Sequence, residues 1–95
     1  MALRVSRDAE LDLNDIYAYG ARTFGVAAAD RYASELLRTL RLIADNPHLA
    51  RERKEVGRPL RLYPFGAHHI IYTIASENVV ILRVLGHRQD WQNLL

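Results

Sequence analysis

The chain has 95 residues, the size of one compact domain, and leaves no room for a second one. Hydrophobic residues make up 49% of it and charged residues 25%, which are values typical of a globular protein. The absence of cysteine excludes disulfides, thiolate zinc sites and thiol catalysis. The N-terminus lacks the apolar segment of a signal peptide, and no apolar run is long enough to cross a membrane. We therefore expect a cytoplasmic protein with no membrane partner.

The net charge of +2 is unevenly distributed along the chain. Residues 1–46 contain six Arg and seven acidic residues, whereas residues 47–95 contain seven Lys or Arg and four acidic residues. Twelve of the thirteen cations are Arg, whose planar guanidinium pairs well with carboxylates and phosphates, although a high-GC genome would enrich Arg as well. The basic second half favours an acidic partner, either nucleic acid or an acidic protein segment, and does not choose between them.

The first half of the chain predicts one short strand and two helices. Residues 2–6 alternate between apolar and polar side chains, as a strand does. Ser6 or Asp8 is placed to cap a first helix, which Gly25 ends. A second helix is expected from about Val26 to Asn46, because the following proline disfavours helical conformation in the residue before it. One face of the first helix is meant for burial, since apolar or small residues recur at helical spacing: Leu13, Ile16, Tyr17 and Gly20. Two such helices joined by a short turn form a helical hairpin.

The second half predicts a sheet. Residues 48–57 are polar and charged, which is typical of an exposed loop. Three strands follow at residues 59–65, 68–75 and 79–85, and the short connection at residues 76–78 indicates a hairpin turn. The order β-α-α-β-β-β predicts an α+β fold in which the helical hairpin packs on one face of a small antiparallel sheet. The other face would stay free to be polar or to bind a partner.

The candidate functional residues lie on and beside the last strands. Arg83 interrupts an apolar run, where an unpaired charge would be costly. If Glu77 and Asn78 form a two-residue turn, Arg83 lies opposite Tyr72 and the two side chains can meet. The alternative is a structural salt bridge from Arg83 to an acidic residue of a helix or of the tail. The whole cluster comprises Arg58, Arg61, Tyr63, His68, Tyr72, Arg83, His87, Arg88, Asp90 and Trp91.

The C-terminal part of this cluster has two interpretations. In the functional one, His87 exchanges protons near neutral pH, Arg88 holds a phosphate, and Trp91 stacks on a base or anchors a partner. In the structural one, Trp91 fills core space and Asp90 pairs with Arg88.

No cofactor or metal site is expected. The sequence contains no Gly-rich phosphate loop, no paired-histidine metal motif and no nucleophile elbow. His68 and His69 are adjacent on a predicted strand and therefore point to opposite faces. Three leucines, Leu37, Leu42 and Leu49, fall outside the clean helical stripes or in a loop, and each is a possible partner contact.

Segments along nearly the whole chain, in the right order, resemble the ParE-type plasmid-stabilisation toxins of the ParE/RelE superfamily. They are the opening of the first helix (Ser6 to Tyr19), the interhelix turn and the start of the second helix (Phe24 to Tyr32), that helix's end (Ile43 to Pro47), the central strands (Leu60-Arg61 and Gly66 to Tyr72) and the closing segment (Arg83 to Trp91). The resemblance implies the same β-α-α-β-β-β fold. It also implies a ParD-like antitoxin partner, whose acidic, amphipathic C-terminal segment wraps the toxin.

The resemblance leaves two activities open. ParE-type members act on DNA gyrase and block replication, whereas RelE-type members cut messenger RNA on the ribosome. Cleavage by the 2′-hydroxyl needs a base, an acid and cations around the phosphate, parts that His87, Arg61, Arg83 and Arg88 could supply. However, no tyrosine follows Tyr72 and no lysine follows Lys54 in this chain. The sequence therefore favours a gyrase inhibitor that acts by binding. The alternatives are a metal-independent ribonuclease that uses this set of residues, or an inactive relative that only binds its antitoxin.

Overall fold

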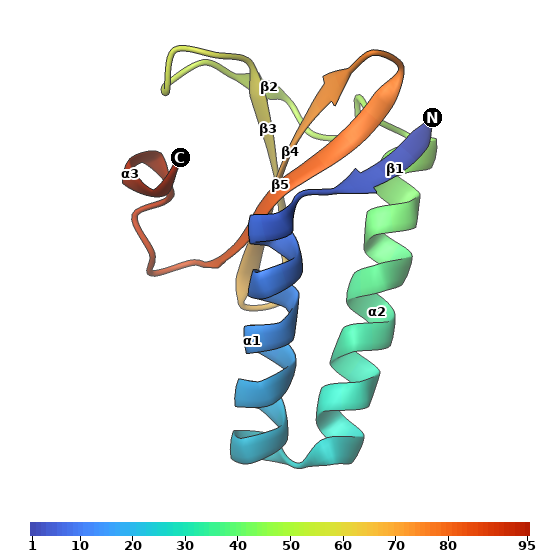
Figure 1. Cartoon of the computed structure of the whole chain (residues 1–95), viewed down its shortest axis with the longest axis vertical. Coiled ribbons are helices and arrows are strands. Elements are labelled where there is room, and N and C mark those ends of the chain that lie inside the picture. Colours follow the sequence, from blue (N-terminus) through green and yellow to red (C-terminus); the bar gives the residue numbers. More distant parts are fainter.

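The computed structural model describes residues 1–95 and contains two long helices and a five-stranded sheet (Figure 1). The elements in chain order are β1 (Ala2–Val5), α1 (Arg7–Phe24), α2 (Val26–Asp45), β2 (Glu52–Arg53), β3 (Leu60–Phe65), β4 (His68–Ala75), β5 (Asn78–Gly86) and α3 (Trp91–Leu94). The α+β class and the helical hairpin on the sheet agree with the prediction. Neither long helix has the apolar stretch that crossing a bilayer requires.

The sheet has the strand order β1-β5-β4-β3-β2 and is mixed rather than antiparallel. β1 pairs with β5 in parallel, and the other three pairs are antiparallel. The prediction of an antiparallel sheet was therefore wrong for its first strand. A parallel pair needs a long crossover connection, and the helical hairpin together with the three following strands supplies it. The prediction also missed β2, which lies in the segment expected to be a loop, and the short α3.

Local chemistry sets the helix ends where the sequence predicted them. The Oγ atom of Ser6 accepts a hydrogen bond from the backbone N–H of Ala9 at 3.0 Å and so caps α1. Gly25 ends α1 with a φ of +92°, a conformation that glycine adopts without a steric penalty. Asn46 ends α2 immediately before Pro47.

The register of the β4–β5 hairpin differs from the prediction. The turn residues are Ser76 and Glu77, with φ values of +49° and +64°, so Ala75 pairs with Asn78. Hairpins of two turn residues favour this pair of positive φ angles, but usually with Asn or Gly. A β-bulge follows between Ile71 and Tyr72 of β4 and their partners, which leaves Arg83 opposite Ile71. The predicted pairing of Arg83 with Tyr72 was therefore wrong.

Apolar clusters lie on both faces of the sheet. The larger one joins the helices to the sheet and includes Leu36, Leu40 and Ile43 of α2. The smaller one consists of Leu60, Ile71 and Leu85, against which four more side chains and Trp91 pack. The second face, expected to be free, is thus partly covered by the C-terminal segment.

The helical hairpin extends well beyond the end of the sheet. Figure 1 shows α1 and α2 side by side, with their connection at Gly25 far from the strands. The hairpin tip around Gly25 therefore lies beyond the sheet, and the last contact of α2 with the strands on that side is that of Tyr32 with Phe65 and His68.

Candidate functional site

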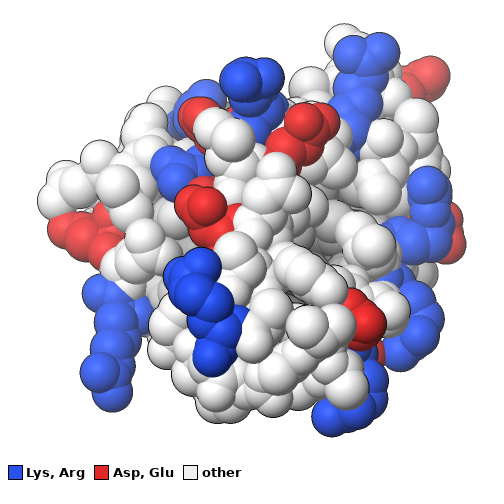
Figure 2. Space-filling view, turned by 60° about the horizontal axis from the view of Figure 1, so that its bottom comes forward, with Lys and Arg blue, Asp and Glu red and all other residues white.

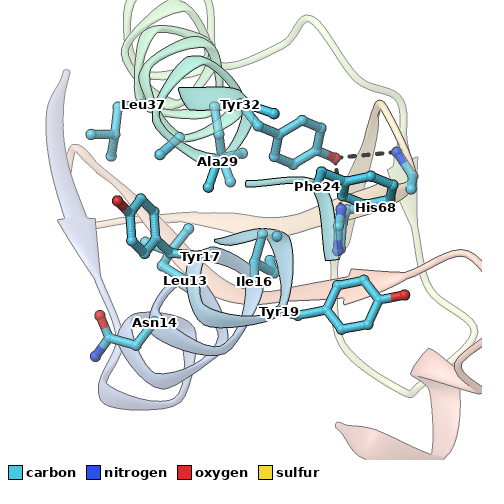
Figure 3. Close-up of a pocket in the computed structure, with 15 residues that line it drawn as sticks. Leu13, Asn14, Ile16, Tyr17, Tyr19, Phe24, Ala29, Tyr32, Leu37 and His68 are labelled. Atoms are coloured by element: carbon cyan, nitrogen blue, oxygen red, sulfur yellow. Dashed lines mark hydrogen bonds between the residues drawn. The ribbon is translucent and has the colours of Figure 1, made fainter. Parts of the chain in front are cut away.

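A groove of about 570 Å³ opens between α1 and α2, beside the turn that joins β3 to β4. Twelve of its fifteen lining residues are hydrophobic, and none carries a formal charge at neutral pH. Figure 3 shows these side chains converging on the groove from both helices. The lining consists of Leu13, Asn14, Ile16, Tyr17, Tyr19, Gly20, Phe24, Ala28, Ala29, Tyr32, Ala33, Leu36, Leu37, Ala67 and His68.

Large apolar side chains remain exposed along the groove and at the hairpin tip. Phe24 is 70% exposed, Val26 60%, and Tyr19 and Leu37 58% each. The rings of Tyr19 and Phe24 meet edge to face with centroids 6.4 Å apart. With the hairpin end turned forward, Figure 2 shows a broad uncharged area, with charges of both signs mostly toward its margins. A contiguous exposed apolar surface of this kind is typical of a partner-binding site.

One hydrogen bond joins the two helices across the groove. The hydroxyl of Tyr17 donates to Oδ1 of Asp30 at 2.6 Å. The carboxylate stabilises the protonated phenol and so raises the pKa of Tyr17.

Tyr32 and His68 form the other end of the groove, where Figure 3 shows the hydroxyl of Tyr32 close to the His68 ring. The Oη atom of Tyr32 lies 2.7 Å from Nδ1 of His68 and accepts a hydrogen bond from the backbone N–H of Ala67 at 3.2 Å. Burial raises the pKa of Tyr32 and lowers that of His68, because it disfavours both charged forms. At Gly66 a Cβ atom would lie 2.6 Å from the Tyr32 hydroxyl, so this arrangement requires glycine there.

His87 holds the same β3–β4 turn from the other side of the sheet. Its Nε2 atom donates to the carbonyl of Gly66 at 2.8 Å, which leaves Nδ1 to accept from Nε2 of His69 at 3.1 Å. The pKa of His69 is lowered by burial, by His87 and by Arg53. As predicted, His68 and His69 lie on opposite faces, and each has its own partner.

Arg83 forms the structural salt bridge that the sequence left as the alternative. Its Nε and Nη2 atoms donate to the two carboxylate oxygens of Asp12, at 2.8 and 2.9 Å. Asp12 also accepts from the backbone N–H of Val84 at 2.9 Å, and Arg83 donates to the carbonyl of Leu94 at 3.3 Å. The hydrogen bond that Arg83 donates to Asp12 raises the pKa of Arg83. Arg83 therefore ties β5 to α1 and α3.

Tyr72 and Arg61 also have structural contacts. The fully buried Tyr72 donates from its hydroxyl to the carbonyl of Pro47 at 2.9 Å and accepts from the N–H of Ala50 at 3.3 Å. Burial raises its pKa. Arg61, its neighbour on β3, donates to the carbonyl of Ala50. Both side chains fasten the segment after α2 to the sheet.

The remaining predicted residues are separate from one another. Arg58 and Arg88 are exposed and form no ion pair within the chain. Trp91 packs on the smaller apolar cluster, with the guanidinium of Arg53 5.4 Å from its ring centroid, in line with the core-filling interpretation. The predicted pairing of Asp90 with Arg88 is absent, because the Asp90 carboxylate accepts from Asn93 instead.

The structure does not bring the predicted ribonuclease residues to one place. Arg61 lies at the β2 end of β3, and His87 binds the turn at the opposite end, about 15 Å away at 3.3 Å per residue. The groove, by contrast, was missed by sequence reasoning apart from Leu37 and His68, which were named as separate candidates. The small residues at helical spacing, Gly20 and Ala29 among them, were the available signal, because they let two helices approach closely and leave space beside large side chains.

The fold and the groove define a small α+β protein with an exposed apolar surface between its two long helices. Residues 3–91 match the family described as ParE toxin of type II toxin-antitoxin system, parDE. The chain is 35% identical over 82 residues to Toxin ParE1 of Caulobacter vibrioides, covering 86% of this chain and 84% of that one. Toxin ParE1 of Mycobacterium tuberculosis is 29% identical over 87 residues, which cover 90% of this chain and 89% of that one. The chain therefore belongs to the ParE toxin family of type II toxin–antitoxin systems.

The fold is shared with a solved structure described as the chromosomal ParDE TA system from P. aeruginosa. The two superpose with a TM-score of 0.78 over 90% of this chain and 95% of that chain, at 17% sequence identity. At this identity the similarity concerns the fold alone.

Proposed function

We propose that this toxin acts in the cytoplasm by binding DNA gyrase and blocking replication, and that a ParD-like antitoxin neutralises it. The observation that carries the choice of mechanism is the salt bridge of Arg83, one of the three cations of the predicted ribonuclease set. Both carboxylate oxygens of Asp12 hold its guanidinium, which is therefore not available to a scissile phosphate. Releasing it would leave the partly buried carboxylate of Asp12 with only the N–H of Val84 as a hydrogen-bond partner.

Two further side chains of the predicted cluster are also engaged elsewhere. The phenol of Tyr72 is buried under the loop that follows α2, and Arg61 is fixed to the carbonyl of Ala50. A general acid and a general base must both reach the reacting atoms within hydrogen-bond distance. Binding, rather than chemistry, is the activity that this surface supports best.

The groove between α1 and α2 is the proposed antitoxin site. Its uncharged lining and exposed rim suit the apolar face of an amphipathic helix, a common form of peptide recognition. The basic second half of the chain then attracts the acidic part of the same segment, as the charge distribution predicts. An unfolded segment that folds on this surface would also stabilise the small domain by mass action.

The test of the target is to induce the chain without its antitoxin and to follow thymidine and methionine incorporation within minutes. Our proposal predicts an early loss of DNA synthesis while translation continues. Purified chain should also inhibit supercoiling by purified gyrase, and equimolar antitoxin should restore it. An early loss of protein synthesis with intact supercoiling would contradict the gyrase assignment.

A ribosome-dependent ribonuclease is the second candidate, and one local arrangement favours it. His87 and His69 form a hydrogen-bonded imidazole pair, with the exposed Arg88 next in sequence. This mechanism predicts transcripts cut within codons on translating ribosomes, and a His87→Gln variant that no longer cuts. If neither replication nor translation changes, the chain is an inactive relative that only binds its antitoxin.

A further inference from the structure

His68 is the one groove-lining side chain whose ordinary pKa lies near neutral pH. Its Nδ1 atom faces the hydroxyl of Tyr32 at 2.7 Å, and its Nε2 atom has no hydrogen-bond partner in the chain. No buried polar side-chain atom lacks a partner, so Nε2 of His68 is open to solvent. A mostly apolar groove therefore presents the free Nε2 donor of His68 at the end where the β3–β4 turn lies.

The hydrogen-bond network around His68 tolerates two protonation states. In the neutral state, the Tyr32 hydroxyl accepts from the N–H of Ala67 and donates to Nδ1, which places the imidazole proton on Nε2. In the charged state, Nδ1 donates to Tyr32, whose own proton turns to the carbonyl of Phe65 at 3.4 Å. Nε2 carries a proton in both states and points away from Tyr32.

The groups that face His68 do not satisfy this donor. Tyr32 comes from α2, and His87 follows β5 and opposes a positive charge on His68. Asp12 of α1 attracts that charge only weakly, because its two oxygens bind Arg83. His69, next in sequence, lies on the opposite face beside His87. Burial is the largest influence and lowers the pKa of His68, so the unbound groove holds a neutral imidazole.

We propose that the helix bound in this groove carries a carboxylate that pairs with Nε2 of His68, in addition to the apolar side chains that fill the groove. The inference rests on the proposed function, since the antitoxin supplies the helix. The groove lining contains no acidic residue that would compete for His68. A charge-assisted hydrogen bond in an apolar groove fixes the register of the helix, which apolar contacts alone define poorly.

The sign of the pH dependence follows from linkage. A partner carboxylate favours the imidazolium, so the pKa of His68 in the complex lies above its value in the free chain. Binding then takes up a proton. The affinity is greatest below the free pKa and falls as pH rises through the pKa of the complex. Each unit of difference between the two pKa values changes the affinity by up to about tenfold.

The experiment uses the full chain and the antitoxin encoded beside it. The pKa of His68 is measured by NMR of histidine-labelled chain, free and in the complex. The affinity is measured from pH 6 to pH 8 for the wild type, for His68→Gln and for His48→Gln. Glutamine keeps an N–H donor near the Nε2 position but cannot titrate. His48, an exposed histidine outside the groove, is the matched control.

We expect a higher His68 pKa in the complex and severalfold tighter binding at pH 6 than at pH 8. That difference should be lost in His68→Gln and kept in His48→Gln. A complex that forms with the pKa of His68 unchanged or lowered would overturn this inference and leave the proposed function standing. If no complex forms at any pH, both the inference and the proposed antitoxin site are wrong. The wild-type NMR result does not depend on the folding of any variant.

Discussion

Asp12 of α1 accepts two hydrogen bonds from Arg83 of β5, at 2.8 and 2.9 Å, and a third from the backbone N–H of Val84. β1 ends at Val5, which pairs with Ile81. The part of β5 after Ile81 therefore has no neighbouring strand on the β1 side. Ser6 also binds this edge of β5, because its Oγ donates a hydrogen bond to the carbonyl of Leu82 at 2.8 Å. Side chains thus replace a strand along the free edge of β5.

This relationship predicts a large effect of Asp12→Ala on stability. The change leaves the N–H of Val84 without a partner and the partly buried guanidinium of Arg83 with only the carbonyl of Leu94. We expect the free energy of unfolding to fall by about 2–3 kcal/mol, as measured by urea denaturation.

A double variant, Asp12→Ala with Arg83→Met, is the matched control. It removes the unpaired charge and should recover part of the lost stability. A loss below about 0.5 kcal/mol in Asp12→Ala would mean that water replaces the carboxylate at little cost.

Gly66→Ala tests the packing of the β3–β4 turn. A methyl group there would meet the Tyr32 hydroxyl at 2.6 Å, and the φ of +52° disfavours a side chain. We expect a loss of about 2–3 kcal/mol in thermal or urea unfolding, together with displacement of Tyr32 from His68.

Gly57→Ala separates the two causes. Gly57 has a φ of +79°, but no atom lies within 4 Å of the position that a methyl group would take, so only backbone strain applies. The substitution should cost about 1 kcal/mol. Equal losses in both variants would show that the contact with Tyr32 contributes nothing.

Features set by neighbouring residues could be predicted from the sequence. Ser6 caps a helix through its own hydroxyl, and Gly25 and Asn46 end helices through backbone preferences of one or two residues. The opposite faces of His68 and His69 follow from the alternation of a strand. The helical hairpin and the three longer strands were therefore found with nearly correct boundaries.

Features that depend on distant segments were not predicted. The position of Arg83 depends on a turn at Ser76 and Glu77, which are unusual residues at positive φ, and on a bulge. A strand of two polar residues, Glu52–Arg53, has no alternation to detect. The groove depends on how α1, α2 and the β3–β4 turn pack together, which no local sequence pattern predicts. For the candidate site, sequence reasoning grouped Arg61 and His87 by residue type, and the fold places them at opposite ends of β3.

Leu37→Glu tests the groove as the antitoxin site. Leu37 lines the groove and is 58% exposed, so a carboxylate there should not disturb the fold. It would meet the apolar face of a bound helix, and we expect the antitoxin affinity to fall at least about tenfold. Isothermal titration with purified antitoxin measures the change.

Leu42→Glu is the control on the same helix. Leu42 is 45% exposed and lies outside the groove. Its variant should bind antitoxin within about twofold of the wild type, because a single exposed leucine contributes little. If Leu42→Glu weakened binding as much as Leu37→Glu, the antitoxin would cover another surface of α2.

The lowered pKa values of His68 and His69 predict that the free chain loses stability in weak acid. Burial lowers the pKa of His68 and of His69 in the folded chain below the ordinary value of 6.5, whereas the unfolded chain keeps that value. The unfolded state then binds more protons, so stability rises with pH across this range. As pH falls through 6.5 the free energy of unfolding should decrease, and the decrease should stop below the folded pKa values.

Urea midpoints at pH 7.5 and pH 5.5 measure this loss of stability, and the midpoint should be lower at pH 5.5. Because glutamine does not titrate, the pH 5.5 deficit should shrink in His69→Gln and persist in His48→Gln. A deficit of the same size in His69→Gln and in the wild type would assign the acid sensitivity to other groups.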